Sequence, residues 1–184
     1  KYLTLFTFST ENWKRPKREI KYLLNILEEY IDKQFNNLLK NGIKIRIIGL
    51  IKKFSINLRK KLNQLELLTK KNKKIQVNIA LNYGSRQEIL QSIKQIKKKS
   101  LMINEKNLTR FLYTKNIPDP EILIRTGNIN RISNFLLWQS IYSEIFFEKK
   151  LWPDFEKKDF YKIIDKFKKI KRNFGAIRYE RDTK

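Results

Sequence analysis

Residues Ile75–Ile96, IQVNIALNYGSRQEILQSIKQI, determine the fold class that this sequence predicts. Their apolar residues first alternate with other residues, as in a β-strand, and the polar turn Asn82–Gly84 then interrupts the pattern. Ser85 and Glu88 form an S-x-x-E capping box, which starts a helix whose isoleucines recur at helical spacing. The stretch is therefore predicted to be a strand that passes through a short turn directly into a helix.

The same strand-to-helix order recurs on both sides of this stretch. Apolar runs predict further strands at 3–8, 43–49, 122–124 and 145–147. Apolar residues at helical spacing predict helices at 16–40, after Ser55, at 108–113 and from near Asp154 onward. Strands that alternate with helices pair in parallel, so we predict an α/β protein with a mostly parallel central sheet flanked by helices, in a single domain, 1–184.

The composition limits the chemistry. A chain of 184 residues with 41% hydrophobic residues can bury one core. The absence of cysteine and histidine excludes disulfides, zinc clusters and catalysis by imidazole. Carboxylates, amides, hydroxyls, arginines or an oxygen-bound metal must then carry any reaction. No signal peptide and no apolar run long enough to span a bilayer is visible, so we expect a cytoplasmic protein.

The net charge of +24 raises the alternative of a basic nucleic-acid-binding protein. The basic residues are mostly lysines, however, and they are scattered along every segment, while Ile and Asn are also abundant. This pattern is typical of a proteome-wide drift in composition rather than of a selected binding stripe, so nucleic-acid binding is the lesser alternative. The same charge favours peripheral contact with an anionic lipid surface, such as the inner face of the cell membrane.

The segment 119–155 concentrates polar side chains around one turn. An apolar run stops at Arg125, a second arginine follows at Arg131, and Ser133 opens an apolar segment that we expect to be a helix. Two arginines in a loop between a strand and a helix suit a diphosphate, and Glu144 beside them suggests a bridging metal. Spacing alone leaves open that these are ordinary surface arginines and a solvated acid.

A parallel sheet would bring several such turns together. Asn12, Asn82, Arg86 and Arg125 each follow a predicted strand directly. Ligands of parallel sheets bind outside the carboxyl ends of the strands, so we expect these four side chains to meet at one edge.

Four motifs occur here in one order: FSTENWKRP (8–16), NYGSR (82–86), RTG with RISNFLLWQ (125–139), and YSE followed by WPDF (142–155). Together they resemble the cis-prenyltransferases, specifically bacterial undecaprenyl diphosphate synthases, from about Leu3 to Gly175. The resemblance implies a homodimeric, Mg²⁺-dependent enzyme that condenses isopentenyl diphosphate with farnesyl diphosphate. It further implies a long-chain cis-polyprenyl diphosphate, the lipid carrier of cell-wall synthesis, which grows inside a hydrophobic tunnel.

The resemblance also implies roles for particular residues. Asn12 stands at the catalytic proton-acceptor position, and because an amide is a poor base we interpret it as orienting or relaying the proton. Glu144 stands at the Mg²⁺-ligand position. The implied substrate-binding residues are Ser9, Thr10, Glu11, Trp13 and Arg15, together with Arg125, Arg131, Ile132 and Ser133 of the isopentenyl diphosphate site.

Some of these positions have a second, structural interpretation. Trp13 would equally pack a strand–helix corner, and Arg15 would equally be a surface residue. The apolar residues of the helix at 16–40 would line either the core or the tunnel: Leu23, Leu24, Leu27 and Ile31. The segment 171–175 resembles the family's terminal arginine–glycine segment, which closes over the diphosphate, but it would also suit a frayed basic tail.

The sequence departs from the family in two places. Gly127-Asn128-Ile129 stands where the family has Gly-Gly-Glu, which changes the shape or polarity of that loop. The family's glycine-rich phosphate loop, with its essential Mg²⁺-binding aspartate, has no counterpart, because Lys1 falls at the family's second strand. We therefore expect either an N-terminally incomplete enzyme or a non-catalytic member that supports a partner chain. An in-frame Asp-Gly-Asn-Gly-Arg segment upstream in the gene would favour the enzyme.

We predict that the 184-residue chain alone is poorly soluble and catalytically silent. Without the phosphate loop, the allylic leaving group lacks charge stabilisation and a strand edge stays unpaired. Fusion of an N-terminal family segment ahead of Lys1 should restore incorporation of labelled isopentenyl diphosphate into long-chain product. Substantial turnover by the chain alone would contradict this account of the metal site.

Overall fold

A computed structural model describes residues 1–174, except for the side chain of Phe35. The chain divides into two compact units, Lys1–Pro118 and Asp119–Lys184, and each is described on its own. All strand pairs in both units are parallel, in a three-stranded and a two-stranded sheet. The predicted α/β class is confirmed. The prediction of a single domain stays a prediction.

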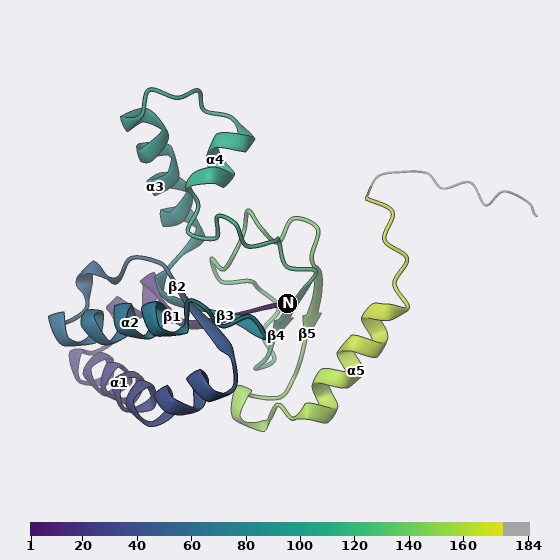
Figure 1. The fold of residues 1–184 in the computed structure, drawn as a ribbon. Coiled ribbons are helices and arrows are strands. Elements are labelled where there is room, and N and C mark those ends of the chain that lie inside the picture. The colour runs from purple at the N-terminus through teal and green to yellow at the C-terminus, as the bar shows by residue number, and fades with distance from the viewer. Residues whose placement is uncertain (175–184) are drawn as a thin grey trace, which may run out of the picture. The chain divides into compact units, whose positions relative to one another are not determined.

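The first unit alternates strands and helices as predicted (Figure 1). Its elements are β1 (Tyr2–Ser9), α1 (Lys17–Lys40), β2 (Ile43–Ile48), α2 (Ile56–Thr69), β3 (Ile75–Tyr83), α3 (Ser85–Lys98) and α4 (Glu105–Phe111). Two short 3-10 turns, η1 (Thr10–Lys14) and η2 (Ile51–Lys53), follow β1 and β2. The strand order is β1-β3-β2, so β3 lies in the centre of the sheet.

Local sequence signals explain most helix ends. Pro16 precedes α1, and Asn41 caps its C-terminus before Gly42, whose φ is +67°. Ser55 caps α2, because its hydroxyl oxygen accepts the N–H of Leu58 at 3.1 Å.

The predicted capping box at α3 is wrong. Gly84, not Ser85, is the N-cap residue. Glu88 is turned elsewhere: its carboxylate accepts the hydroxyl of Tyr83 at 2.5 Å and the backbone N–H of Tyr113 at 2.8 Å. A fully buried carboxylate needs such donors, and this tertiary requirement overrides the local capping signal.

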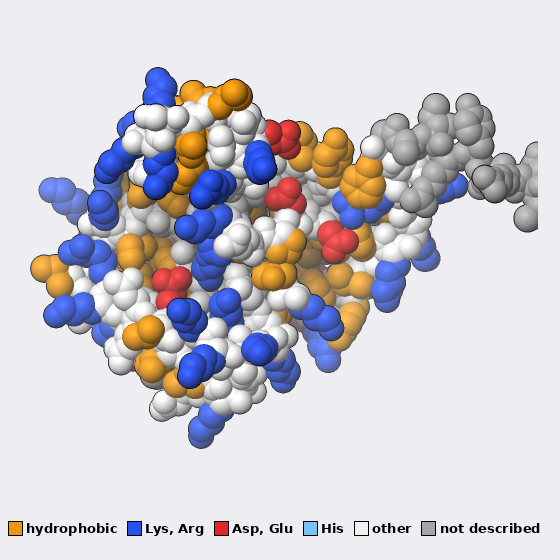
Figure 2. Space-filling view, turned by 45° about the horizontal axis from the view of Figure 1, so that its top comes forward, with side chains coloured by type: hydrophobic (Ala, Val, Ile, Leu, Met, Phe, Trp, Pro, Cys, Tyr) orange, Lys and Arg blue, Asp and Glu red, His pale blue; other side chains and the backbone are white. Residues whose placement is uncertain are grey.

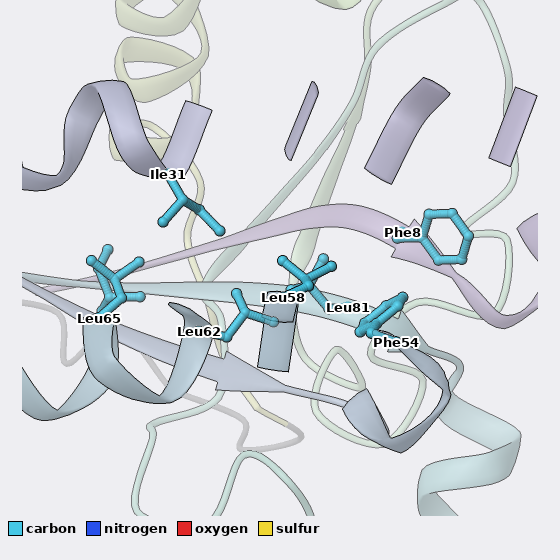
Figure 3. Close-up of a cluster of buried hydrophobic side chains, with 8 residues drawn as sticks. Phe8, Ile31, Phe54, Leu58, Leu62, Leu65 and Leu81 are labelled. Atoms are coloured by element: carbon cyan, nitrogen blue, oxygen red, sulfur yellow. The ribbon is translucent and has the colours of Figure 1, made fainter. Parts of the chain in front are cut away.

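The core of the first unit lies between the sheet and the helix pair α1 and α2 (Figure 3). Spacings of four and three residues place Leu58, Leu62 and Leu65 on one face of α2, where each is at most 1% exposed. The remaining members of this cluster are Phe8, Ile31, Ile45, Phe54 and Leu81. Burial of one such side chain contributes roughly 1.5–3 kcal/mol, so this cluster is the main stabilising feature of the unit.

Helix α2 also protects the outer edge of β2. The N–H of Ile45 donates to Thr69 Oγ1 at 3.0 Å, and the N–H of Ile47 donates to Glu66 Oε1 at 2.7 Å. Asn72 Nδ2 donates to the carbonyl of Ile43 at 2.8 Å. These bonds satisfy backbone groups that would otherwise offer a template for pairing with another chain.

The second unit pairs β4 (Ile122–Arg125) with β5 (Glu144–Phe147) and continues through η3 (Trp152–Asp154) into α5 (Lys157–Lys168). The helix expected from Ser133 is absent from its described residues, since 133–142 form successive turns. Ser133, Asn134 and Leu136 have φ values of +49°, +62° and +46°. Residues in the left-handed region cannot continue a right-handed helix, which explains the wrong prediction.

The charged side chains on the visible surface are mostly basic (Figure 2). Figure 2 shows lysine and arginine spread over the visible face, with acidic side chains sparse. No helix within residues 1–174 is both long enough and apolar enough to cross a membrane.

Candidate active site

Asn82 joins the carboxyl ends of all three strands of the first unit. Trp13 Nε1, after β1, donates to Asn82 Oδ1 at 2.7 Å, and Asn82 Nδ2 donates to the carbonyl of Leu50, after β2, at 2.6 Å. The backbone N–H of Leu50 donates back to the carbonyl of Asn82 at 3.3 Å. Asn82 is 4% exposed with φ +47°, a conformation that asparagine tolerates better than most residues.

Gly49 makes this junction possible. Its φ is +117°, and a Cβ at this position would lie 2.1 Å from the carbonyl oxygen of Leu81. Only glycine permits β2 and β3 to approach so closely at their ends.

Trp13 packs into the corner between β1 and α1. The centre of its ring lies 5.2 Å from the ring centre of Phe8 and 5.7 Å from that of Phe54. Lys53 Nζ lies 5.8 Å from the centre of the Trp13 ring. These contacts agree with the interpretation of Trp13 as a residue that packs the strand–helix corner. Its role in substrate binding stays a prediction.

Asn12 folds back onto the end of β1. Its Oδ1 accepts the backbone N–H of Ser9 at 2.7 Å. Because Oδ1 is already engaged as an acceptor, the side chain offers its NH₂ group as a donor. This geometry favours an orienting role for Asn12 over direct proton abstraction, a role that stays a prediction.

Two further residues of this segment interact with neighbouring carboxylates. Thr10 Oγ1 donates to Glu11 Oε2 at 3.1 Å, and Arg15 Nη1 lies 2.7 Å from Glu19 Oε1. The Arg15–Glu19 pair is solvent-exposed on both sides, and exposed pairs are typically worth about 0.2–1 kcal/mol. Arg15 can therefore exchange Glu19 for a diphosphate at little cost. A hollow of about 420 Å³, lined by Pro16, Arg18, Glu19 and Tyr22, lies beside this pair.

A buried tyrosine–carboxylate network, which the sequence reasoning missed, lies at the start of α3. Glu88 is fully buried and binds Tyr83 and the backbone of Tyr113. Burial, together with the nearby Glu88, raises the pKa of Tyr113 to about 12. The signal that would have indicated this network is the polar spacing Ser85, Glu88 and Ser92, which places three polar side chains on the buried face of α3.

Arg46 fixes the segment that carries Tyr113. Its guanidinium donates to the carbonyls of Tyr113 and Lys115, both at 2.8 Å, and burial lowers its pKa. A cavity of about 420 Å³ lies here, lined by Ile47, Gly49, Gln95, 111–113 and Lys115. None of the predicted site residues lines it.

In the second unit, Arg125 ends β4 with a half-buried side chain. Its Nε is buried and has no hydrogen-bond partner among residues 1–174. The following loop is held by the N–H of Gly127, which donates to the carbonyl of Lys150 at 2.7 Å, and by the N–H of Asn128, which donates to that of Glu148 at 3.0 Å. Asn128, at this departure from the family, has φ +55°, a left-handed conformation that asparagine adopts more readily than most non-glycine residues.

The predicted diphosphate residues continue along this loop. Arg131 is exposed, and Ser133 and Asn134 are successive left-handed residues after Ile132. Successive backbone N–H groups in such turns form concave anion sites. Any anion site at this position is therefore built by turns rather than by the helix N-terminus that the sequence predicted.

Glu144 does not lie beside Arg125 in the sheet. The strand register pairs Glu144 with Ile122 and Arg125 with Phe147, so the two residues lie at opposite ends, about 10 Å apart along the strands. Glu144 Oε1 instead lies 3.7 Å from Nε of Arg172. The expected adjacency was wrong because the connection 126–143 returns to the start of the sheet before β5 begins.

Arg172 is the centre of this second cluster. It lies 3.5 Å from Glu121, donates to the carbonyl of Tyr142 at 2.7 Å, and stacks 4.6 Å from the ring centre of Phe174. The predicted C-terminal segment is thus folded onto its own unit up to Phe174. Gly175 lies outside the described residues.

Comparisons with known proteins identify the family. A sequence model of undecaprenyl diphosphate synthases, a prenyltransferase family, matches residues 1–175. This chain belongs to that family. An isoprenyl transferase of Rickettsia bellii is 47% identical over 95% of this chain and 77% of its own length. One of Thermotoga maritima is 42% identical over 96% and 78%.

Solved structures agree with the prenyltransferase assignment. A probable undecaprenyl diphosphate synthase of Campylobacter jejuni superposes with a TM-score of 0.89 at 40% identity, over 95% of this chain and 83% of that one. Lavandulyl diphosphate synthase of Lavandula x intermedia, in complex with dimethylallyl diphosphate, gives 0.87 at 29% identity, over 95% and 79%. The fold and the enzyme class predicted from the motifs are thereby confirmed.

The carboxylates of this prenyltransferase can be compared with the ligands that Mg²⁺ requires. The described part of the chain contains no group of three or more acidic side chains that could cage a metal. Mg²⁺ often binds through only one or two carboxylates, with water and substrate phosphates completing its octahedron. Glu144, 32% exposed, fits such a single protein ligand once Arg172 moves away.

We predict that Trp13→Phe destabilises the first unit. The change removes the Nε1 donor and leaves Asn82 Oδ1 buried without a partner, which typically costs about 1–3 kcal/mol. Urea unfolding monitored by circular dichroism measures the difference. Trp152→Phe, at a position 65% exposed, is the matched control and should change stability by less than about 0.5 kcal/mol. Equal stability of both variants would contradict the role of Asn82.

Proposed function

We propose that this prenyltransferase condenses isopentenyl diphosphate with an allylic diphosphate, farnesyl diphosphate, to make a long-chain cis-polyprenyl diphosphate. The product would serve as the lipid carrier for cell-wall synthesis. The observation that supports this most directly is Arg125, a half-buried guanidinium with an unpartnered Nε at the head of a turn-rich loop. The lavandulyl diphosphate synthase, which is similar to this chain, was solved with an allylic diphosphate.

The isopentenyl diphosphate would bind to the loop after β4. Arg125 and Arg131 would hold its phosphate oxygens, since a guanidinium matches them in bidentate geometry. The backbone N–H groups around Ile132 and Ser133 would add neutral donors, because left-handed residues turn successive N–H groups toward one concavity. The charge of the two arginines and the shape of the loop would then both recognise the diphosphate end of the substrate.

The allylic diphosphate would bind near Ser9–Asn12 and Arg15. The C–O bond to its diphosphate breaks, a C–C bond forms to isopentenyl diphosphate, and a proton leaves the latter for the released diphosphate. Asn12, which donates through its NH₂ group, would orient that proton transfer. Mg²⁺ held by Glu144 would supply neutralisation of phosphate charge. Positioning of the two substrates would contribute much of the remaining rate.

We predict that Arg125→Ala and Arg131→Ala each weaken binding of isopentenyl diphosphate by about 1.5–3 kcal/mol, the range for hydrogen bonds to charged groups. Titration calorimetry measures the loss. Arg110→Ala, an exposed arginine on α4, is the control that removes the same charge and should leave affinity unchanged. Unchanged binding in both site variants would overturn the assignment of the diphosphate site.

One observation favours a second candidate, a non-catalytic family member that supports a partner chain. Glu144 is paired with Arg172 rather than placed beside the diphosphate arginines. The two candidates differ in turnover: a supporting chain, supplied with isopentenyl diphosphate and farnesyl diphosphate, would bind isopentenyl diphosphate but never incorporate it into product. Incorporation under those conditions selects the enzyme.

We further propose a homodimer formed by the face around β5. This face consists of five exposed apolar residues: Leu137, Ile141, Tyr142, Ile145 and Phe147, each at least 40% exposed. β5 is also an edge strand within the described part of the second unit. Several exposed apolar residues near an edge strand are typical of an interface between identical subunits.

For the dimer, we predict that Ile141→Glu with Tyr142→Glu shifts the protein to monomers, because four charges would be buried in a two-fold contact. Sedimentation equilibrium measures the mass in solution. Ile56→Glu, at an α2 position 65% exposed, is the control and should leave the dimer intact. A dimer that survives the double change would exclude this face as the interface.

A further inference from the structure

Seven lysines gather at the amino-terminal edge of the three-stranded sheet. Lys1 precedes β1, Lys40 and Lys44 flank the α1–β2 turn, and four more lie between α2 and β3: Lys70, Lys71, Lys73 and Lys74. We call this set the lysine edge. Three separate stretches of chain contribute to it.

Strand register and backbone bonds hold these stretches together. The N–H of Lys74 donates to the carbonyl of Gly42 at 3.1 Å, and the N–H of Gln76 donates to that of Lys1 at the same distance. In the register, Ile43 lies opposite Ile75 and Tyr2 lies opposite Gln76. The starts of all three strands are therefore level with one another, and the lysines follow from that alignment.

The positive charge of this edge is not balanced locally. Six of the seven lysines are exposed and Lys44 is partly so. Within residues 1–174, no ion pair reaches any of them. The sequence has no acidic residue from 33 to 65 or from 67 to 87, and Glu66 between these ranges accepts the N–H of Ile47.

Helix dipoles account for only part of this charge. Lys40 and Lys70 lie at the C-terminal ends of α1 and α2, where a cation is favourable. Lys73 and Lys74 lie beyond the last turn of α2, where the effect of the dipole has largely vanished. Lys1 belongs to no helix. The remaining charge therefore has no stabilising role within the unit.

Apolar side chains accompany the lysines. Leu67 and Leu68, on the last turn of α2, are 70% and 46% exposed. They precede Lys70 and Lys71 by three residues each in the chain, so both leucines lie directly beside the lysine edge. A basic cluster with protruding leucines combines the two attractions that bind proteins to a membrane surface.

We propose that the lysine edge docks on an anionic lipid bilayer. A second copy of the chain fits poorly, because it would bring the same uncompensated lysines against this edge. Nucleic acid fits less well than lipid, because the set contains no arginine for bidentate base contacts and exposed leucines gain nothing from phosphate backbones. The reason for such docking rests on the proposed function, because a long polyprenyl product partitions into a membrane.

The first experiment measures co-sedimentation of the full protein, without substrates, with vesicles of phosphatidylglycerol and phosphatidylcholine. A lysine near such a surface contributes roughly a fivefold gain in partition. We expect the variant with Lys70, Lys71, Lys73 and Lys74 each changed to Gln to lose binding by on the order of several hundredfold. The control variant changes four other exposed lysines, which lie on or next to α3 and α4, to Gln: Lys97, Lys98, Lys99 and Lys106. It removes the same charge and should lose far less vesicle binding.

The second experiment tests the leucines. Leu67→Ser with Leu68→Ser should remove most of the binding that persists at high salt, because the apolar contribution is not screened. Circular dichroism checks that every variant is folded, and both leucines are exposed enough to be replaced without loss of core packing.

Three outcomes would overturn the proposal. Equal loss in the two four-lysine variants would show that only net charge matters. Equal binding to vesicles of phosphatidylcholine alone would show that lipid charge is irrelevant. Stronger binding to RNA or duplex DNA than to anionic vesicles, abolished by the first variant, would assign the edge to nucleic acid. None of these measurements depends on prenyl transfer, so failure of the proposed enzyme activity would be seen separately.

Discussion

The buried amide of Asn82 is the interaction on which the carboxyl edge of the first unit depends. It accepts from Trp13 and donates to Leu50, and so connects the chain segments that leave β1 and β2 to the end of β3. A buried amide that loses either partner retains a desolvated polar group, which is expensive. The positions of Asn12 and Arg15, a few residues along the same segment, follow from this junction. Gly49 belongs to it as well, since any Cβ there would collide with Leu81.

Weak surface ion pairs hold several of the predicted ligand-binding groups. Arg15 pairs with Glu19, and Arg172 pairs with Glu144 and Glu121. The exposed Arg15–Glu19 pair contributes little to stability, so a diphosphate can replace Glu19 without unfolding the surroundings. Arg125 differs, because its buried Nε has no partner within the described residues. Its guanidinium is the group with most to gain from an anion.

The two ends of the three-stranded sheet have different chemistry. The carboxyl edge carries hydrogen-bonded amides and the candidates for binding the allylic diphosphate, whereas the amino edge carries lysines with no acidic partner among residues 1–174. In a parallel sheet every strand contributes one end to each edge, so the polarity of the strands separates the two sets. Under our proposals, the allylic diphosphate binds at one edge and the membrane is met at the other.

Sequence patterns were sufficient to predict the five strands, their parallel pairing, most of the helices and, through motifs such as NYGSR and RISNFLLWQ, the prenyltransferase family. These features depend on periodicity and local residue identity, which a linear chain carries directly. Tertiary structure alone decided where Glu88 and Glu144 point, and whether the segment after Ser133 is helical. A local pattern of capping or apolar residues cannot report a partner such as Tyr113 or Arg172 that lies far away in the chain. Burial and charge pairing with those distant partners outweighed the local signals, because a buried carboxylate without donors costs more than a missing helix cap.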